Sequence, residues 1–265
     1  MADPIFRTEI AGGVARVTLN RPQKRNALTR ELIGLFAESL AAIRGDESVR
    51  LVIVAAEGPV FCAGMDLGEM QGRAGSPNAA EEWREDTRVY RELVERLYRF
   101  PLPTLAVLQG PVLAGGVGIV AACDLVLAAE GAFFALPEPQ RGITAAVVAP
   151  LLIRRAGIAG ASHLLLSGRN LSAEAAMRMG LCHEVVPASD LDARVSDWAS
   201  SILTGSPSAL AITKRLLLDA AGDALSEQLD AAMEISARAR ETADAREGLA
   251  AFLDKRPPAW QPRGE

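Results

Sequence analysis

A run of small residues at positions 110–124, GPVLAGGVGIVAACD, constrains this chain more than any other stretch. It follows residues 104–108 (TLAVL), a short apolar segment that is typical of a buried strand. Pro111 and the glycines end that strand, and residues 117–122 then favour a buried helix. Such a turn exposes unpaired backbone N–H groups at the positive end of the helix dipole. The turn is therefore either a packing device or a site for a developing negative charge.

A second small-residue turn follows another apolar segment. Residues 51–56 (LVIVAA) predict a buried strand, and residues 60–67 (VFCAGMDL) form the turn after it. Two strands that each lead to such a turn can aim two backbone N–H groups at one oxygen atom. That arrangement is an oxyanion hole.

At this point the sequence resembles the crotonase superfamily, which contains the enoyl-CoA hydratases and isomerases. Five motifs occur in the expected order: Asn20-Arg21-Pro22 with Asn26-Ala27-Leu28, residues 61–67 (FCAGMDL), residues 110–124, Leu136-Pro137-Glu138, and Gly180-Leu181. The resemblance covers roughly residues 5–260. It is specific for the superfamily and does not select one reaction.

Composition excludes several other classes. The chain has 265 residues and a formal net charge of −5 without a basic stripe, so we expect no nucleic-acid partner. The most apolar window, residues 112–129, contains Asp124 and several glycines, so we expect no membrane span. The N-terminus shows no signal-peptide pattern, and a cytoplasmic location is expected. The three cysteines lie in apolar runs without metal-ligand spacing, which predicts buried free thiols and no metal site: Cys62, Cys123 and Cys182.

Strand and helix patterns alternate as far as about residue 200, and helical patterns follow. This order predicts an α/β fold with mostly parallel strands. The resemblance implies a crotonase-like spiral of ββα units with a helical C-terminal part. We therefore expect residues 1–199 to form the α/β spiral core with the acyl-CoA site, and residues 200–265 a helical part for oligomerisation. Within that part, Asp244 and Glu247 form an expected capping box.

Two further segments carry local expectations. Thr29 is the expected cap of a helix with its apolar face formed by Leu32, Leu35, Phe36, Leu40 and Ile43. Residues 67–80 lack an apolar period and contain three glycines and a proline. We interpret them as a loop, either a lid over the site or a disordered surface segment.

The resemblance implies that the substrate is a CoA thioester, whose oxygen lies between the backbone N–H groups of Ala63 and Gly115. Hydratases of the family usually carry two glutamates. The place of the first is occupied here by Gly118, and Glu138 matches the second. Because Glu138 lies between two prolines in an apolar stretch, desolvation is expected to raise its pKa.

The matching motifs also imply a set of substrate-binding residues. Asp66 and Asp124 are expected to order their turns, and Arg73 and Arg84 are further candidates for the CoA phosphates. After Gly142 the family's glycines are replaced by residues 143–150 (ITAAVVAP), so the pocket differs there. The expected binding residues are Lys24, Arg25, Ala27, Cys62, Gly64, Met65, Asp66, Leu67, Gly116, Gly118, Pro137, Gly142, Phe252 and Lys255.

Three functions remain open from the sequence. Double-bond isomerisation of an enoyl-CoA is favoured, because one carboxylate can remove a proton and return it to another carbon. Syn hydration of a 2-enoyl-CoA by a single glutamate is the alternative, and a non-catalytic acyl-CoA-binding protein is the second alternative. No cofactor beyond the substrate's own CoA is expected. The resemblance implies a homotrimer or a dimer of trimers.

Overall fold

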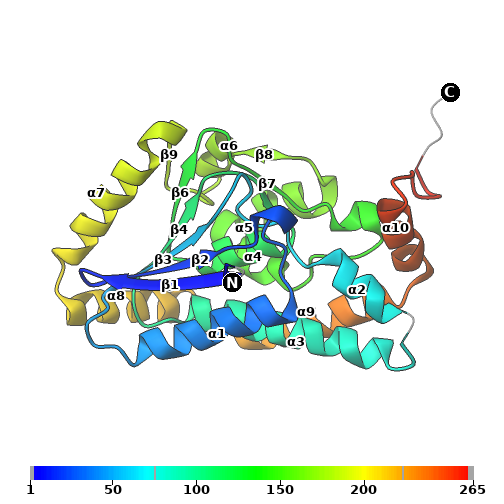
Figure 1. Ribbon diagram of the computed structural model, residues 1–265, viewed down its shortest axis with the longest axis horizontal. Coiled ribbons are helices and arrows are strands. Elements are labelled where there is room, and N and C mark those ends of the chain that lie inside the picture. Colours follow the sequence, from blue (N-terminus) through cyan, green and yellow to red (C-terminus); the bar gives the residue numbers. More distant parts are fainter. Residues whose placement is uncertain (1–2, 75, 223, 262–265) are drawn as a thin grey trace.

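The computed structural model describes residues 3–74, 76–222 and 224–261. Its main sheet has six strands in the order β1-β2-β3-β4-β6-β9, and a smaller sheet has the order β5-β7-β8 (Figure 1). The main strands are β1 (Phe6–Ala11), β2 (Val14–Leu19), β3 (Leu51–Ala56), β4 (Thr104–Leu108), β6 (Leu125–Ala129) and β9 (Glu184–Val186). The small strands are β5 (Val112–Leu113), β7 (Phe133–Ala135) and β8 (Leu171–Ser172).

Strand pairing in the main sheet is parallel except at one edge. β1 and β2 form an antiparallel hairpin through Gly12 and Gly13, whose φ angles of 57° and 84° suit a tight turn. From β2 to β9 every pair is parallel. The prediction of an α/β fold with mostly parallel strands is therefore confirmed.

Helices cover both faces of the sheet. They are α1 (Arg30–Arg44), α2 (Leu67–Ala74), α3 (Ala79–Tyr98), α4 (Gly115–Ala122), α5 (Val148–Ser167), α6 (Ala173–Arg178), α7 (Leu191–Leu203), α8 (Pro207–Ala220), α9 (Leu225–Arg240) and α10 (Ala243–Leu253). Three short 3₁₀ helices are η1 (Pro22–Lys24), η2 (Glu138–Arg141) and η3 (Ala188–Asp190). In the described ranges, none of these helices is both long enough and apolar enough to traverse a bilayer.

The residues of β3 alternate between two apolar cores, as a strand covered on both faces requires. Val52 and Val54 face the larger core, and Leu51 and Ile53 face a smaller one that α7 covers. The apolar face predicted for α1 is buried in the larger core apart from the half-buried Leu35. Thr29 caps this helix as expected, because its side chain accepts a hydrogen bond from the Leu32 N–H at 3.1 Å. The three cysteines are free and buried, which confirms the prediction of buried free thiols.

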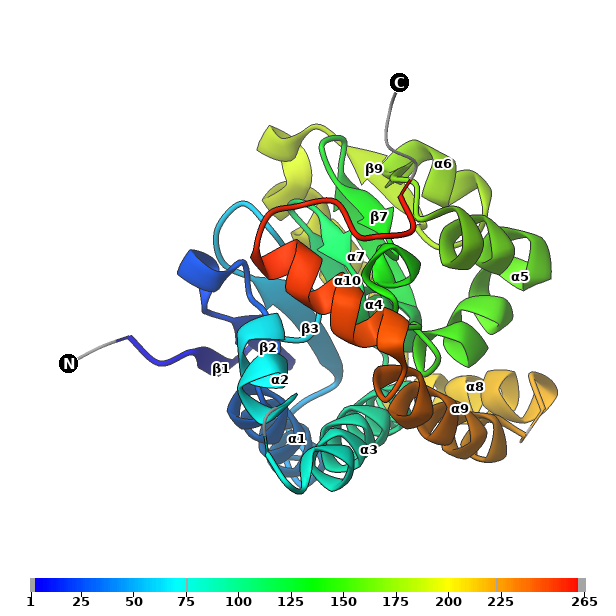
Figure 2. The ribbon, with the colours of Figure 1, turned by 90° about the vertical axis from the view of Figure 1, so that its right-hand side faces the viewer.

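The C-terminal helices pack against the α/β body. α9 lies along α3, and its Leu225 and Leu229 belong to the larger core. α10 packs against η2 and lies on the same side of the molecule as α2 and α9 (Figure 2). A Cβ on Gly142 would lie 2.0 Å from the Asp244 carbonyl oxygen, so glycine permits this contact. The division at residue 199 stays a prediction.

Two local predictions were wrong. The described part of residues 67–80 is not one irregular loop, because α2 occupies 67–74 and α3 begins at Ala79; residue 75 lies outside the described residues. The Asp66 carboxylate accepts hydrogen bonds from the Gly68 and Glu69 N–H groups, which stabilises the start of α2. The cap of α10 is Thr242 rather than a box formed by Asp244 and Glu247. The Thr242 hydroxyl accepts from the Ala245 N–H at 3.0 Å.

Candidate active site

Glu138 is a buried carboxyl group with one oxygen atom that no described residue contacts through a hydrogen bond. It opens η2 directly after Pro137, and only 6% of its surface is exposed. Among the described residues, its Oε2 atom has no hydrogen-bond partner. Burial is the largest influence and raises the pKa of Glu138 from 4.5 to about 7, although a hydrogen bond from its own backbone N–H and, to a smaller extent, the nearby Arg141 oppose the shift. A carboxyl group with such a pKa can both take and give a proton near neutral pH.

The two small-residue turns lie against each other beside Glu138. Gly64 has a φ of 82°, and a Cβ there would lie 2.4 Å from the Ala114 Cβ. A Cβ on Gly116 would lie 2.8 Å from the Cys62 Cβ. Glycine at both positions lets the turns approach closely, which is their packing function. An isolated bridge between Cys62 and Val112 joins the same segments.

The two expected oxyanion donors differ in their present hydrogen bonding. Within the described residues, the Gly115 N–H at the start of α4 has no acceptor outside its own helix. The Ala63 N–H donates to the Arg25 carbonyl oxygen at 3.0 Å. Gly115 thus presents a free donor, whereas Ala63 must share or release its bond to reach a substrate oxygen. The paired oxyanion hole stays a prediction.

The expected catalytic residues line an inner cavity of about 60 Å³. Ala63, Gly115 and Glu138 all line it. Ala114 and Arg141 also line it, and the remaining wall comes from α2 with Met65 beside it, α3, residues 143–148 and α9. Leu67 and Met70 of α2 line the cavity, and a lid formed by residues 67–80 stays a prediction.

The place expected for a first glutamate is already filled. A Cβ on Gly118 would lie 2.1 Å from the hydroxyl oxygen of Tyr90, which comes from α3. Tyr90 is buried, and its hydroxyl donates to the Gly115 carbonyl oxygen at 2.5 Å. Burial, more than the nearby Cys62 and Glu138, raises the pKa of Tyr90 well above its usual value, so the phenol stays protonated. Gly118 therefore makes room for the Tyr90 hydroxyl, so the absent glutamate is replaced by a different side chain from α3.

An outer cavity of about 380 Å³ adjoins the inner one. Ala63, Met65, Leu67 and Arg141 line both. The outer wall also holds five other residues that were expected to bind substrate: Lys24, Arg25, Ala27, Asp66 and Phe252. The Arg141 guanidinium lies 4.3 Å from the centroid of the Phe252 ring, which links η2 to α10.

The remaining expected binding residues line neither cavity. Gly64 and Gly116 hold the turns together, Gly142 admits α10, and Pro137 precedes η2. Cys62 is fully buried, and Lys255 follows the end of α10 outside both walls. As expected, the two aspartates order their turns. Asp66 forms an ion pair with Arg21 at 2.6 Å. Asp124 accepts a hydrogen bond from the Thr104 N–H and forms an ion pair with Lys214.

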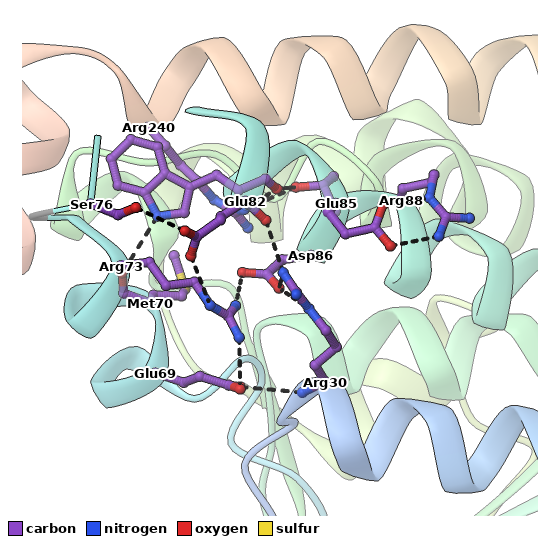
Figure 3. Close-up of polar contacts among 12 residues, drawn as sticks. Arg30, Glu69, Met70, Arg73, Ser76, Glu82, Glu85, Asp86, Arg88 and Arg240 are labelled. Carbon is purple, nitrogen blue, oxygen red and sulfur yellow. Dashed lines mark hydrogen bonds and ion pairs between the residues drawn. The ribbon is translucent and has the colours of Figure 1, made fainter. Parts of the chain in front are cut away.

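Sequence reasoning missed a polar cluster at the far wall of the inner cavity. The Asp86 carboxylate of α3 lies between the guanidinium groups of Arg30 and Arg73, as Figure 3 shows. Arg73, a candidate for the CoA phosphates, is thereby matched by carboxylates, and Arg84 pairs with Glu234 at the surface. Arg240 of α9 is also buried at this wall. Its spacing from Leu229, Ala232 and Ser236 places it on the buried helix face, a signal present in the sequence.

Residues 9–263 match the family described as "Enoyl-CoA hydratase/isomerase". The chain belongs to this family. The crystal structure of an enoyl-CoA hydratase from Mycobacterium avium has a TM-score of 0.88 and 32% identity, covering 98% of this chain and 100% of that one. The predicted superfamily and its fold are confirmed, and the family acts on acyl-CoA thioesters.

Relatives within the enoyl-CoA hydratase/isomerase family differ in their named reactions. A 2,3-dehydroadipyl-CoA hydratase of Escherichia coli is 35% identical over 254 residues, which cover 94% of this chain and 96% of the relative. A 1,2-epoxyphenylacetyl-CoA isomerase of Escherichia coli is 31% identical over 254 residues, which cover 96% and 97%. Membership therefore supports a lyase or an isomerase without selecting between them.

Proposed function

We propose that this chain moves the double bond of an enoyl-CoA thioester, with Glu138 as its single acid and base. The observation that supports this most is the carboxyl group of Glu138, buried beside the Gly115 N–H in the inner cavity. Asp86 also lines that cavity, but it is paired with two guanidinium groups. Among the described lining residues, Glu138 is therefore the carboxyl group that is not ion-paired.

The outer cavity would hold the CoA portion, and the acyl chain would enter the inner one. Lys24 and Arg25 supply positive charge on the outer wall for the phosphates. Phe252 and Arg141 offer a flat apolar and cationic surface between the two cavities. The thioester carbonyl would then reach the junction where Ala63 lines both. No cofactor besides the substrate's own CoA enters this proposal.

In the proposed reaction, the Glu138 carboxylate removes a proton from C2 of a 3-enoyl-CoA. The electron pair of the broken C–H bond spreads over the double bond and the thioester, so negative charge builds on the carbonyl oxygen. The Gly115 N–H stabilises that charge, and the Ala63 N–H joins it once released from Arg25. A well-placed donor contributes roughly 3 kcal/mol to such a transition state. Glu138 then returns the proton to C4, which gives the 2-enoyl-CoA.

Hydration of a 2-enoyl-CoA is the second candidate, supported by the hydratases among the relatives. It requires one group to activate water for attack on C3 and a proton source for C2. The space that the family's first glutamate would need, at Gly118, is taken by the Tyr90 hydroxyl, which donates its proton to the Gly115 carbonyl oxygen. Isomerisation needs only the carboxyl group that the cavity supplies, and for that reason we favour it.

The experiment that tests the proposal identifies products. The purified protein is incubated separately with 3-enoyl-CoA and 2-enoyl-CoA thioesters of matched length, and each product is identified by mass spectrometry. Faster formation of 2-enoyl-CoA than of 3-hydroxyacyl-CoA is expected. Faster hydration would reverse the order of the two candidates. Binding of both esters without turnover would leave a non-catalytic acyl-CoA-binding protein, the third possibility from the sequence.

A further inference from the structure

One wall of the inner cavity is polar and positively charged, unlike the apolar wall formed by residues 143–148. It is built by Ser236 and Arg240, which lie one helical turn apart on α9, and by Thr87 and the ion-paired Asp86 of α3. Within the described residues, three of them have no ion-pair partner: Ser236, Arg240 and Thr87. Their exposed fractions are 6%, 8% and 2% respectively. Polar side chains buried to this degree normally have hydrogen-bond partners. Donors on this wall that lack a partner therefore indicate what kind of ligand the wall can bind.

Arg240 uses only one of its three nitrogen atoms within the described residues. Its Nη1 donates to the Trp83 carbonyl oxygen at 3.1 Å and to the Thr87 hydroxyl at 2.9 Å. Nε and Nη2 have no acceptor in that part of the chain. These two nitrogens form the edge of a guanidinium that binds a carboxylate through two parallel hydrogen bonds.

The nearest protein carboxylate is already engaged. Asp86 binds Arg30 through Oδ1 at 2.6 Å and Arg73 through Oδ2 (Figure 3). Across residues 3–74, 76–222 and 224–261, no carboxylate oxygen lies within 4.0 Å of an Arg240 nitrogen. Asp86 attracts Arg240 from farther away, but burial outweighs it and lowers the pKa of Arg240 to about 10. The guanidinium is still charged at neutral pH.

Ser236 provides a second donor on the same wall. Its hydroxyl has no hydrogen-bond partner among the described side chains and backbone groups, although the residue lines the cavity. We infer that the acyl chain accepted by this protein ends in a carboxylate, which Arg240 binds through Nε and Nη2 and Ser236 binds through its hydroxyl. The substrate class is thus the mono-CoA thioester of an unsaturated dicarboxylic acid. This inference rests on the proposed function, since it assigns the far end of the same acyl site.

A purely structural role for Arg240 would not need the charge. Linking α9 to α3 takes the two hydrogen bonds of Nη1, which a neutral donor could also make. A buried guanidinium without a carboxylate is unfavourable, and a bound anion would offset that cost. The substrate carboxylate would provide the missing partner, and its own desolvation would be offset by three N–H or O–H donors.

The test compares the turnover of two 3-enoyl-CoA thioesters of equal length, one with an acyl chain that ends in a carboxylate and one with an acyl chain that ends in a methyl group. We expect the wild-type protein to favour the carboxylate by on the order of 10²-fold in kcat/KM, the scale measured for close buried charge pairs. Arg240→Met should abolish that preference mainly through KM, and Ser236→Ala should reduce it less. Arg238→Met is the matched control, because Arg238 lies on the exposed face of the same helix. Its preference should equal that of the wild type.

Each outcome decides the inference. Equal or better turnover of the methyl-ended ester by the wild type would overturn it and leave the proposed reaction intact. A loss of both activities to the same extent in a folded Arg240→Met variant would also overturn it. If that variant does not fold, the wild-type ratio alone decides. If the wild type turns over neither ester, the proposed reaction fails. The inference is then decided by calorimetric affinities for two saturated acyl-CoA esters of the same length, one ending in a carboxylate and one in a methyl group, and tighter binding of the carboxylate ester would support it.

Discussion

Replacing Glu138 with glutamine should stabilise the folded protein at alkaline pH. Burial raises the pKa of Glu138 from 4.5 to about 7, so the folded state holds this proton more tightly than the unfolded state. The contribution of Glu138 to stability therefore falls as pH rises from about 4.5 to about 7, and above that range the loss is complete. One pKa unit corresponds to ~1.36 kcal/mol, so ionised Glu138 costs about 3 kcal/mol of unfolding free energy.

The assay compares the unfolding of the wild type and Glu138→Gln from about pH 4 to about pH 8. Glutamine has the same shape and stays neutral, so the variant's advantage should grow by about 3 kcal/mol over this range. For a chain of this size that corresponds to a gain of roughly 6–12 °C in Tm. Glu130→Gln is the control, because Glu130 is exposed and should show no such pH-dependent gain. A difference between wild type and Glu138→Gln that does not change with pH would refute the assigned desolvation.

Three further predictions concern the packing, the proton and the assembly. Gly118→Glu should lower the free energy of unfolding by about 1–3 kcal/mol, because its Cβ would lie 2.1 Å from the Tyr90 hydroxyl oxygen. Adding Tyr90→Ala should recover much of the lost Tm, and a Gly118→Glu variant as stable as the wild type would contradict this packing. The kcat/KM for isomerisation should rise with pH around a midpoint of about 7, since Glu138 starts as the base, and a midpoint near 4.5 would count against it. The full chain should sediment as a trimer or a dimer of trimers, and joint Leu216→Lys and Leu217→Lys substitution should give smaller species. A wild-type monomer at micromolar concentration would contradict self-association.

The apolar residues of the C-terminal helices differ in their exposure, and only the exposed ones support self-association. Leu216 and Leu217 of α8 are 64% and 65% exposed, so their side chains are available to a second copy. Leu225 and Leu229 of α9 are also apolar, but the chain's own core buries them. Sequence periodicity reveals an apolar helix face and does not say whether the same chain or another one covers it. The oligomer therefore stays a prediction.

The strand-to-turn segments were predictable because their chemistry is local. An apolar strand followed by glycines needs no distant residue to define it, so the segments at 51–67 and 104–124 fold as expected. The helix at residues 67–74 was missed because its stability depends on contacts that periodicity does not reveal. Asp66 caps it, and Arg73 pairs with Glu69 one turn earlier and with Asp86 of α3.

The site was predictable in its motif residues and hidden in its long-range contacts. Glu138 and Gly115 belong to motifs and do line one cavity. Tyr90 lies 28 positions before Gly118, and only the packing of α3 on α4 brings its hydroxyl into the space above that glycine. Arg240 likewise reaches the cavity through the packing of α9 on α3. Contacts of this kind are set by the tertiary fold and leave no motif.

The measurement that tests the central claim most directly is turnover of a 3-enoyl-CoA by Glu138→Gln beside the wild type, with CoA-ester affinity measured on both. If Glu138 is the acid and base of the reaction, turnover should fall by roughly 10²- to 10⁴-fold. Affinity should change little, because in the proposed complex the CoA contacts lie on the outer cavity and backbone N–H groups hold the thioester. A folded Glu138→Gln protein with unchanged turnover would remove Glu138 from the mechanism and contradict a single-carboxylate isomerase.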